Sequence, residues 1–562
     1  MKVLLIFAVV VTSALALDNG LGLTPPMGWM TWERFRCITD CEKYPKECIS
    51  ENLIIEMADL MVSEGYLEAG YEYVNIDDCW TEMEREDGKI VPDKKRFPRG
   101  MNFLSDYTCA GYPGSLGHLE VDAQSLADWG VDFIKVDGCN VETSEMVDGY
   151  IKFGQLMNKT GRPIMYSCSW PAYFEYYRKP KMIPDYEVLK ETCNLWRNWV
   201  DIDDSWDSVK IIADYFAEVQ DRVAPAAGPG HWNDPDTLLI GNYGLSYDQN
   251  KAQLAIWAIL AAPFLLSNDL RTIKPEIREL IQNRDVIAID QDKLGIQGRL
   301  VNKGNGIEVW ARKVLPIVNG EYSYAIAFVS RRTDGHPHAF QINLKDISLT
   351  HEFGYQVKDL FNPHRNVYQF LQSDSFEERV NPTGANFYKF IPIEKLKECC
   401  DFPKDEFMLE DPECKQHLEG VEKMKGKEKW KAYSCYSECM AIKNGELVDG
   451  EIVVSKLKTD VTVFLMKNNA TDLIDLSNES ITLCNEKFDA KMEQWAKWKE
   501  MNGKNESDDD KKDEKKCSLA PGFIGMCIMG KVVRECPESR RVNSEECEAA
   551  RNNATTVEEC MK

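Results

Sequence analysis

Charged side chains in the first half of the chain stand directly after short apolar runs. They are Asp77, Asp78, Lys135, Asp137, Arg197, Asp201, Asp234 and Asp236. If Phe133–Cys139 is a strand, its side chains alternate faces, so Lys135 and Asp137 share one face. A buried lysine and carboxylate are costly unless they pair or serve a reaction. One strand alone favours a simple ion pair, whereas the similar clusters at other strand ends favour a reaction site.

Carboxylates combined with aromatic rings are what a sugar-binding site needs. The aromatic residues near the charged positions are Trp29, Trp32, Trp80, Trp170 and Tyr173. Rings stack on the C–H faces of a sugar, and carboxylates accept hydrogen bonds from its hydroxyls. Two carboxyl groups about 5–5.5 Å apart can cleave a glycosidic bond with retention, one as nucleophile and one as acid/base. The sequence has no Cys/His cluster with metal-ligand spacing and no glycine-rich phosphate loop.

The elements that must position these residues follow an alternating pattern of strands and helices. Apolar residues at helical spacing predict helices over Ser50–Gly65 and Ala123–Gly130. The predicted strands are Tyr71–Ile76, Phe133–Cys139, Pro163–Ser169, Leu195–Asp201, His231–Asp236 and Pro263–Leu266. Polar clusters at the carboxyl ends of alternating strands are typical of an α/β TIM (β/α)8 barrel, whose active site lies at that face.

Composition divides the rest of the chain. Strand-like pieces separated by turns, without helices, predict an antiparallel β-sandwich after the barrel. Beyond Lys397 the chain is rich in charged residues and cysteines. We therefore expect a signal peptide at residues 1–16, a barrel at 17–300, a sandwich at 301–396 and a cysteine-rich helical extension at 397–562.

The N-terminus and the cysteines indicate the secretory pathway. Lys2, the apolar run Val3–Val11 and Ala14-Leu15-Ala16 are typical of a signal peptide cut before Leu17. The run is too short to span a membrane, and the 19 cysteines suit an oxidising compartment. A net charge of −25 argues against nucleic acid and anionic membranes as partners. We expect a lysosomal or extracellular glycoprotein, with sequons at Asn158, Asn469, Asn478, Asn505 and Asn553.

Longer motifs surround the candidate residues. They are Leu17-Asp18-Asn19-Gly20-Leu21, Thr24-Pro25-Pro26-Met27-Gly28-Trp29, Trp32-Glu33-Arg34-Phe35, Ile76-Asp77-Asp78-Cys79-Trp80, Lys135-Val136-Asp137-Gly138-Cys139, Tyr166-Ser167-Cys168-Ser169-Trp170-Pro171, Trp196-Arg197-Asn198 and Ala227-Gly228-Pro229-Gly230. Over residues 17–395 the chain resembles glycoside hydrolase family 27, which includes lysosomal α-galactosidases and α-N-acetylgalactosaminidases. The resemblance implies a retaining exo-glycosidase, a homodimer and no cofactor or metal.

The same resemblance implies a role for each site residue. Asp137 matches the nucleophile and Asp201 the acid/base, while Asp77 and Asp78 match the carboxylates that hold the 4- and 6-hydroxyls of the sugar. The full set of implied substrate-binding residues is Trp32, Asp77, Asp78, Lys135, Ser169, Ala172, Tyr173, Arg197 and Asp236. The implied disulfides are Cys37–Cys79, Cys41–Cys48, Cys109–Cys139 and Cys168–Cys193.

Substrate choice follows from the loop after Cys168. Galactosidases of the family place Glu and Leu around the 2-substituent of the sugar, whereas this chain has Ser169 and Ala172. Small side chains leave room for an acetamido group. Terminal α-N-acetylgalactosamine (α-GalNAc) of glycolipids or glycoproteins is therefore the expected substrate and α-galactose a weaker one. The alternatives are a plain α-galactosidase and a catalytically inactive protein that binds carbohydrate or a small apolar ligand.

The chain departs from the family after Tyr107. It passes straight to Thr108-Cys109, without the segment that supplies the third barrel strand and a tyrosine of the sugar site. A barrel without one strand has two unpaired edges. A neighbouring segment could fill the gap, the sequence could be a splice form or faulty gene model, or the product could fold poorly.

The region 397–562 lies outside the hydrolase resemblance. Its cysteines are Cys399, Cys400, Cys414, Cys435, Cys439, Cys484, Cys517, Cys527, Cys536, Cys547 and Cys560. Their spacing resembles insect odorant-binding proteins with extra cysteines, which are small helical carriers of apolar ligands. An unrelated disulfide-rich or disordered extension and a fusion of two neighbouring genes are the other interpretations.

Overall fold

The computed structural model describes most of the chain as far as residue 393 and short pieces beyond it. The described residues are 19–99, 109–177, 182–318, 320–351, 354–362, 368–370, 375–393, 439, 441–442, 447–448, 451–452, 454–467 and 473–486. The expected signal peptide and the sequons at Asn469, Asn505 and Asn553 lie outside this part of the chain.

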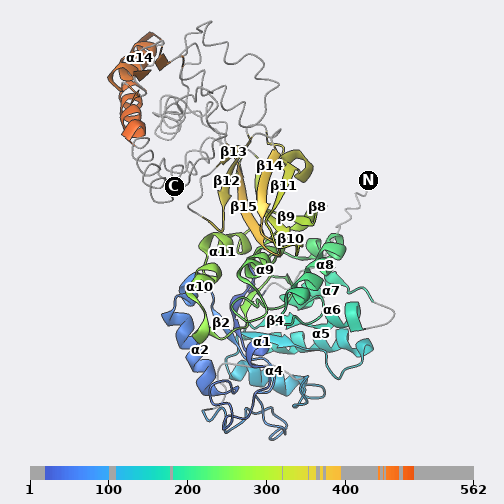
Figure 1. Ribbon diagram of the computed structural model, residues 1–562. Coiled ribbons are helices and arrows are strands. Elements are labelled where there is room, and N and C mark those ends of the chain that lie inside the picture. Colours follow the sequence, from blue (N-terminus) through green and yellow to red (C-terminus); the bar gives the residue numbers. More distant parts are fainter. Residues whose placement is uncertain are drawn as a thin grey trace, which may run out of the picture.

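Parallel strands surrounded by helices form the larger body of the molecule (Figure 1). The strands are β1 (Met27–Met30), β2 (Tyr73–Asn75), β3 (Phe133–Val136), β4 (Met165–Cys168), β5 (Leu195–Arg197), β6 (Trp232–Asp234) and β7 (Phe264–Leu266). The helices are α1 (Trp32–Phe35), α2 (Glu51–Ser63), α3 (Tyr66–Ala69), α4 (Leu119–Asp128), α5 (Thr143–Lys159), α6 (Trp170–Ala172), η1 (Tyr173–Tyr177), α7 (Tyr186–Thr192), α8 (Trp206–Val223), η2 (Ala224–Ala226), α9 (Tyr247–Leu260), η3 (Leu270–Thr272), α10 (Pro275–Ile281) and α11 (Arg284–Asp290).

Strand order shows how the barrel is arranged. One sheet runs β2-β1-β7 and the other β3-β4-β5-β6, with every pair parallel. A parallel bridge between Leu238, which follows β6, and Leu266 of β7 joins the two sheets. Gly28 lies so close to β2 that a Cβ would stand 2.4 Å from the Tyr73 carbonyl oxygen. The described strands therefore form a curved parallel wall with one break, between β2 and β3.

Side chains cross this break where the described residues include no strand. The rings of Tyr73 and Phe133 meet edge to face with centroids 5.5 Å apart. At the carboxyl ends of the same strands, Lys135 Nζ lies 3.0 Å from Asp77 Oδ2. Residues 100–108, where the sequence departs from the family, lie outside the described part of the chain, so the missing third strand stays a prediction. Within the described residues, side chains meet across the break between β2 and β3.

Helix ends agree with their sequence signals. Ser50 caps α2 by accepting a hydrogen bond from Leu53 N, and Ser205 caps α8 in the same way. At α9, Ser246 and Gln249 form a reciprocal capping box. Helix α9 is buried along most of its length, which is typical of a helix with apolar residues on all sides.

An antiparallel β-sandwich follows the barrel. Its elements are β8 (Arg299–Gly304), β9 (Ile307–Val318), β10 (Glu321–Ser330), β11 (His338–Asn343), η4 (Leu344–Ile347), β12 (Tyr355–Asp359), β13 (Tyr368–Phe370), β14 (Ser375–Val380) and β15 (Ala385–Pro392). The larger sheet has the order β13-β12-β15-β10-β9-β8, and β11 pairs with β14. Phe328, Phe376 and Tyr388 fill the space between the sheets.

The sandwich is held to the barrel through α9 and α11. Trp310, Ala327 and Phe387 of the larger sheet belong to the same apolar core as α9. The buried Arg312 donates hydrogen bonds to the carbonyl oxygens of Ala258, at 2.7 Å, and of residues around α11. These contacts make the two parts one packed unit.

Helical structure is also present in the described part of the extension. Its elements are β16 (Leu447–Val448), β17 (Glu451–Ile452), α14 (Val454–Lys467) and a helix over 474–486. Cys439 and Cys484 are both disulfide-bonded. The other cysteines of the extension lie outside the described residues, so the resemblance to odorant-binding proteins stays a prediction. No helix in the described part of the chain is long and apolar enough to cross a membrane.

Candidate active site

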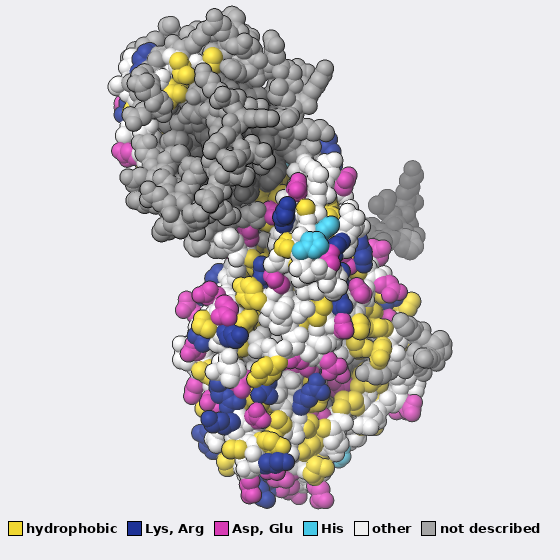
Figure 2. All heavy atoms as spheres, in the orientation of Figure 1, with side chains coloured by type: hydrophobic (Ala, Val, Ile, Leu, Met, Phe, Trp, Pro, Cys, Tyr) yellow, Lys and Arg dark blue, Asp and Glu magenta, His cyan; other side chains and the backbone are white. Residues whose placement is uncertain are grey.

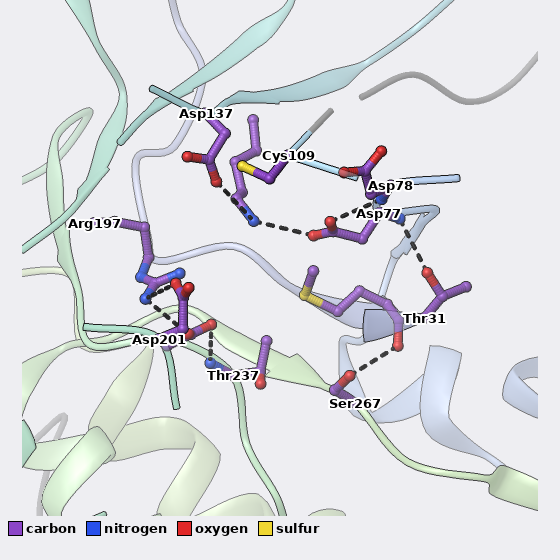
Figure 3. Close-up of polar contacts among 12 residues, drawn as sticks. Thr31, Asp77, Asp78, Cys109, Asp137, Arg197, Asp201, Thr237 and Ser267 are labelled. Atoms are coloured by element: carbon purple, nitrogen blue, oxygen red, sulfur yellow. Dashed lines mark hydrogen bonds and ion pairs between the residues drawn. The ribbon is translucent and has the colours of Figure 1, made fainter. Parts of the chain in front are cut away.

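Five of the charged residues predicted at the strand ends lie together in one region of the barrel (Figure 3): Asp77, Asp78, Asp137, Arg197 and Asp201. Lys135, on β3, lies between two of them. Its Nζ is 3.0 Å from Asp77 Oδ2 and 3.9 Å from Asp137 Oδ2. A cation between two carboxylates offsets the repulsion that would otherwise separate them.

Arg197, at the end of β5, organises the opposite side of the site. Its Nη2 lies 3.0 Å from Asp201 Oδ1 and 2.7 Å from Asp236 Oδ2. The same nitrogen donates to the carbonyl oxygen of Val200 at 3.0 Å, which holds the loop that carries Asp201. Arg197 also interacts electrostatically with Asp137, and Lys135 does so with Asp201. The two candidate catalytic acids therefore share the field of the same two cations.

Asp201 and Asp236 respond differently to this field. Burial acts to raise the pKa of Asp201, but Arg197 and then Lys135 outweigh it, so the pKa lies below its usual range. Burial dominates at Asp236 and raises its pKa despite Arg197. The Asp201 side chain is nevertheless 67 % exposed, so protons and water reach it directly. Exposure allows Asp201 to exchange protons with solvent, while its lowered pKa favours the ionised form.

Asp234 is a buried carboxyl behind the site. Burial, opposed by Arg197 and assisted by Asp236, raises its pKa to about 6. Its Oδ1 accepts a hydrogen bond of 2.8 Å from the backbone nitrogen of Asp236, whose φ of 81° is unusual for a residue other than glycine. Asp234 therefore supports the turn that presents Asp236 to Arg197.

Asp77 and Asp78, after β2, have separate sets of partners. Asp77 faces Lys135, and its backbone nitrogen donates to Thr31 Oγ1 at 3.0 Å. Asp78 accepts backbone hydrogen bonds of 2.8 Å from Cys79 and Ala110. Burial raises the pKa of Asp78 despite these donors. Asp78 thus ties the loop that contains Ala110 to the end of β2.

The loop after β4 provides the small residues predicted beside the sugar. Ser169 and Ala172 are both buried, 3 % and 5 % exposed. Among the described residues, Ser169 Oγ has no hydrogen-bond partner. Tyr173 follows directly, and its hydroxyl donates to Asp137 Oδ1 at 2.5 Å. The loop therefore brings Tyr173 to the candidate nucleophile, and Ser169 N donates to the carbonyl oxygen of Val136, the residue before Asp137.

Trp32 and Glu33 extend the site from the end of β1. Trp32 is half-buried, with the Arg36 guanidinium 6.0 Å from its ring centroid. Glu33 is the site residue that the sequence analysis missed. Its side chain is 1 % exposed and accepts a hydrogen bond of 3.3 Å from Arg36 Nη2. The sequence signal that could have revealed Glu33 was an acid within the motif Trp32-Glu33-Arg34-Phe35. Because β1 was not among the predicted strands, Glu33 was not recognised as a residue at a strand end.

Glu33 should make stability depend on pH. Burial, followed by repulsion from Asp236, raises its pKa from 4.5 to about 7. The folded protein therefore binds the proton more tightly than the unfolded chain, and stability falls as pH rises from about 4.5 to about 7. We expect Glu33→Gln to remove this dependence, so that the stability difference between wild type and variant changes by roughly 3 kcal/mol across that interval.

Denaturant unfolding at a series of pH values measures this difference. Glu145→Gln, on an exposed position of α5, is the control for loss of a carboxylate. A difference between wild type and Glu33→Gln that stays constant with pH would contradict the prediction.

Disulfides brace the strand ends that carry these residues. The bonds are Cys37–Cys79, Cys41–Cys48, Cys109–Cys139 and Cys168–Cys193. They are the four pairs that the family resemblance implies. Cys109, Asp137 and Cys139 are close enough to hold a metal ion, but the disulfide between the two cysteines leaves no thiolate ligand.

Comparisons with known proteins identify the family. A family model described as alpha galactosidase A matches residues 24–292, and one for its C-terminal β-sandwich domain matches 295–384. The chain is 46 % identical to α-N-acetylgalactosaminidase from Gallus gallus over 396 residues, covering 67 % of this chain and 95 % of the relative. The chain belongs to glycoside hydrolase family 27. The sequence prediction of this family is confirmed.

Two further proteins similar to this family 27 chain are named α-galactosidases. Human α-galactosidase A is 43 % identical, with 67 % of this chain and 90 % of that protein covered. The crystal structure of α-galactosidase I from Mortierella vinacea has a TM-score of 0.57 and 25 % identity, and the match covers 67 % of this chain and all of that one. The family fold is thus a parallel barrel followed by an antiparallel sandwich, as predicted.

Supplying the third strand that the sequence analysis predicts to be missing should improve folding of this family 27 chain. We expect that inserting the matching segment of the Gallus gallus relative between Tyr107 and Thr108 raises both secreted yield and activity, because β2 and β3 would gain a shared backbone ladder. Secreted protein and hydrolysis of an aryl α-GalNAc measure the two effects. A flexible insert of equal length is the control, and equal yield and activity with and without the family segment would refute the prediction.

Proposed function

We propose that this protein is a retaining exo-glycosidase that removes terminal α-linked GalNAc, and less readily α-galactose, from glycolipids or glycoproteins. The arrangement of Asp137 and Asp201 under the shared field of Lys135 and Arg197 carries the catalytic part of the proposal. The names of the family relatives support the substrate class.

In the proposed reaction Asp137 attacks the anomeric carbon while Asp201 gives its proton to the oxygen of the leaving group. The C1–O bond to the leaving group breaks and a covalent glycosyl-enzyme forms. Asp201, now ionised, takes a proton from water, and the resulting hydroxide displaces Asp137 from C1. Two inversions give net retention of the α configuration.

The charges of the site bear on the pH at which this reaction runs. Asp201 must be protonated for the first step, yet Arg197 and Lys135 hold its pKa low in the absence of substrate. The protonated fraction falls as pH rises above that pKa. An acidic working pH, as in a lysosome, follows from this requirement.

The loop after β4 carries the choice of sugar. Ser169 Oγ is buried without a partner in the described part of the chain, and Ala172 adds a single methyl group. An acetamido group would fill this space and offer its oxygen to the hydroxyl. The 2-hydroxyl of galactose would leave this space unfilled and the Ser169 hydroxyl without a hydrogen-bond partner. Affinity for α-galactose would therefore be lower.

Hydrolysis of p-nitrophenyl α-GalNAc and p-nitrophenyl α-galactoside at acid pH tests the proposal. We expect a higher kcat/KM for the α-GalNAc substrate, with the α anomer as the first product observed by NMR. A preference for the α-galactoside would favour a plain α-galactosidase, a first product of β configuration would exclude retention, and no hydrolysis of either substrate would favour a binding protein.

Location and assembly belong to the same proposal. The predicted signal peptide and the exposed sequon at Asn158, on α5, support passage through the secretory pathway to the lysosome or the extracellular space. The surface carries many acidic groups among its basic ones (Figure 2). The family resemblance supports a homodimer, which the mass of the protein in solution would test.

A further inference from the structure

Tyr173 reaches from one strand end of the barrel to the acid on the next. It begins η1, directly after α6, and follows β4 in the chain, whereas Asp137 follows β3. Because β3 and β4 pair in parallel, with Val136 opposite Cys168, their carboxyl ends are neighbours. The Tyr173 hydroxyl donates to Asp137 Oδ1 at 2.5 Å, and Gly138 N donates to the same oxygen at 2.7 Å.

The position of the Tyr173 ring depends on Gly138. A Cβ on residue 138 would stand 2.7 Å from Tyr173 Cε2 and 2.8 Å from Cδ2. The ring therefore lies directly against the backbone that follows Asp137. The hydroxyl is also 3.0 Å from Cys139 Sγ, but this sulfur belongs to a disulfide and carries no proton. The phenol is thus the donor, and the carboxylate is its stronger acceptor.

The two oxygens of Asp137 consequently differ. Among the described residues, Oδ1 accepts both short hydrogen bonds. Oδ2 instead faces Lys135 Nζ, which lies 3.9 Å away. An oxygen whose lone pairs already accept two hydrogen bonds is the poorer nucleophile. A carboxylate held at one oxygen also presents the other in a fixed direction, which lowers the entropy lost on reaching the transition state.

We infer that Tyr173 is a positioning residue that holds Asp137 by Oδ1 so that Oδ2 attacks the anomeric carbon. The inference rests on the proposed function and adds a role to the substrate contact expected for Tyr173. In the first step the Oδ2–C1 bond forms, the bond from C1 to the leaving oxygen breaks, and Asp201 supplies the proton to that oxygen. Tyr173 keeps its own proton throughout.

The Tyr173→Phe variant tests this role, because it keeps the ring against Gly138 and removes only the hydroxyl. We expect kcat for the α-GalNAc substrate to fall about 10- to 100-fold, as loss of one charge-assisted hydrogen bond implies, with KM almost unchanged. Tyr176→Phe, on the same helix, is the matched control, because a phenylalanine keeps the ring contact with Trp199. We expect the control to retain both constants.

A second pair of variants tests the contact with Gly138. Gly138→Ala should lower kcat in the wild-type background, because it displaces the Tyr173 ring. In a Tyr173→Ala background, the same substitution should lower kcat only slightly further. Thermal unfolding checks that each variant is folded. Equal effects of Gly138→Ala in the two backgrounds would show that the ring position does not matter.

The outcomes separate this inference from the proposed function. A raised KM with unchanged kcat in Tyr173→Phe would make Tyr173 a substrate contact only and overturn the inference, as would unchanged values of both constants. Full activity of Asp137→Asn would instead overturn the proposed function itself.

Discussion

The Asp137→Asn variant is expected to lose nearly all hydrolysis of the α-GalNAc substrate, with kcat/KM reduced by roughly 10⁴-fold or more, as for the loss of other catalytic nucleophiles. An amide oxygen is a far weaker nucleophile than a carboxylate, so the covalent intermediate would not form at a useful rate. The amide has nearly the same shape as the carboxylate, and Gly138 N and Tyr173 can still donate to its oxygen. Initial rates with the aryl glycoside measure the loss.

Asp132→Asn is the matched control for this variant. Asp132 immediately precedes β3, at the opposite end of the strand from Asp137, and its side chain is 70 % exposed. We expect the control to keep wild-type rates. Thermal unfolding of both variants separates lost chemistry from lost folding. An active, folded Asp137→Asn variant would contradict the assignment of the nucleophile and with it the double-displacement mechanism.

The double variant Ser169→Glu/Ala172→Leu is expected to reverse the sugar preference. The ratio of kcat/KM for α-GalNAc to that for α-galactoside should fall roughly 10²- to 10³-fold, because the larger side chains would fill the space for the acetamido group. Glutamate would in addition accept a hydrogen bond from the 2-hydroxyl of galactose. Both wild-type residues are buried.

Measuring both substrates on the same preparation provides an internal control, since a folding defect would lower both rates together. The single variant Ala172→Leu should already exclude α-GalNAc, but without the gain toward α-galactose that Ser169→Glu supplies. Loss of activity toward both sugars in equal proportion would show that this loop does not line the pocket of the 2-substituent.

Much of the architecture could be predicted from local patterns. The strand-end positions of Lys135, Asp137 and Arg197 followed from apolar runs that stop at polar residues, and these three residues lie together in the structure. The antiparallel sandwich followed from strands separated by turns without helices. Such patterns are local, because hydrophobic periodicity reports which face of an element is buried.

Other features escaped this reasoning. Strand β1, with the sequence Met-Gly-Trp-Met, is short and buried on both faces, so it lacks the alternation that marks a half-buried strand. Missing β1 also hid Glu33, which is polar in sequence but buried in the fold beside Asp236. Its raised pKa depends on neighbours that stand far away along the chain, and no local pattern reports them.

Residue types and spacing predicted the kind of fold and a sugar site built from strand-end carboxylates. The longer motifs around those residues carried the family resemblance, which implies the roles of Asp137 and Asp201. Three-dimensional packing was needed to show that Tyr73 of β2 meets Phe133 of β3 at the break between the described strands, and that Tyr173 and Gly138 hold one oxygen of Asp137. The reason is physical: periodicity depends on a residue's immediate neighbours, whereas a hydrogen bond between two strand ends depends on their register in the folded sheet.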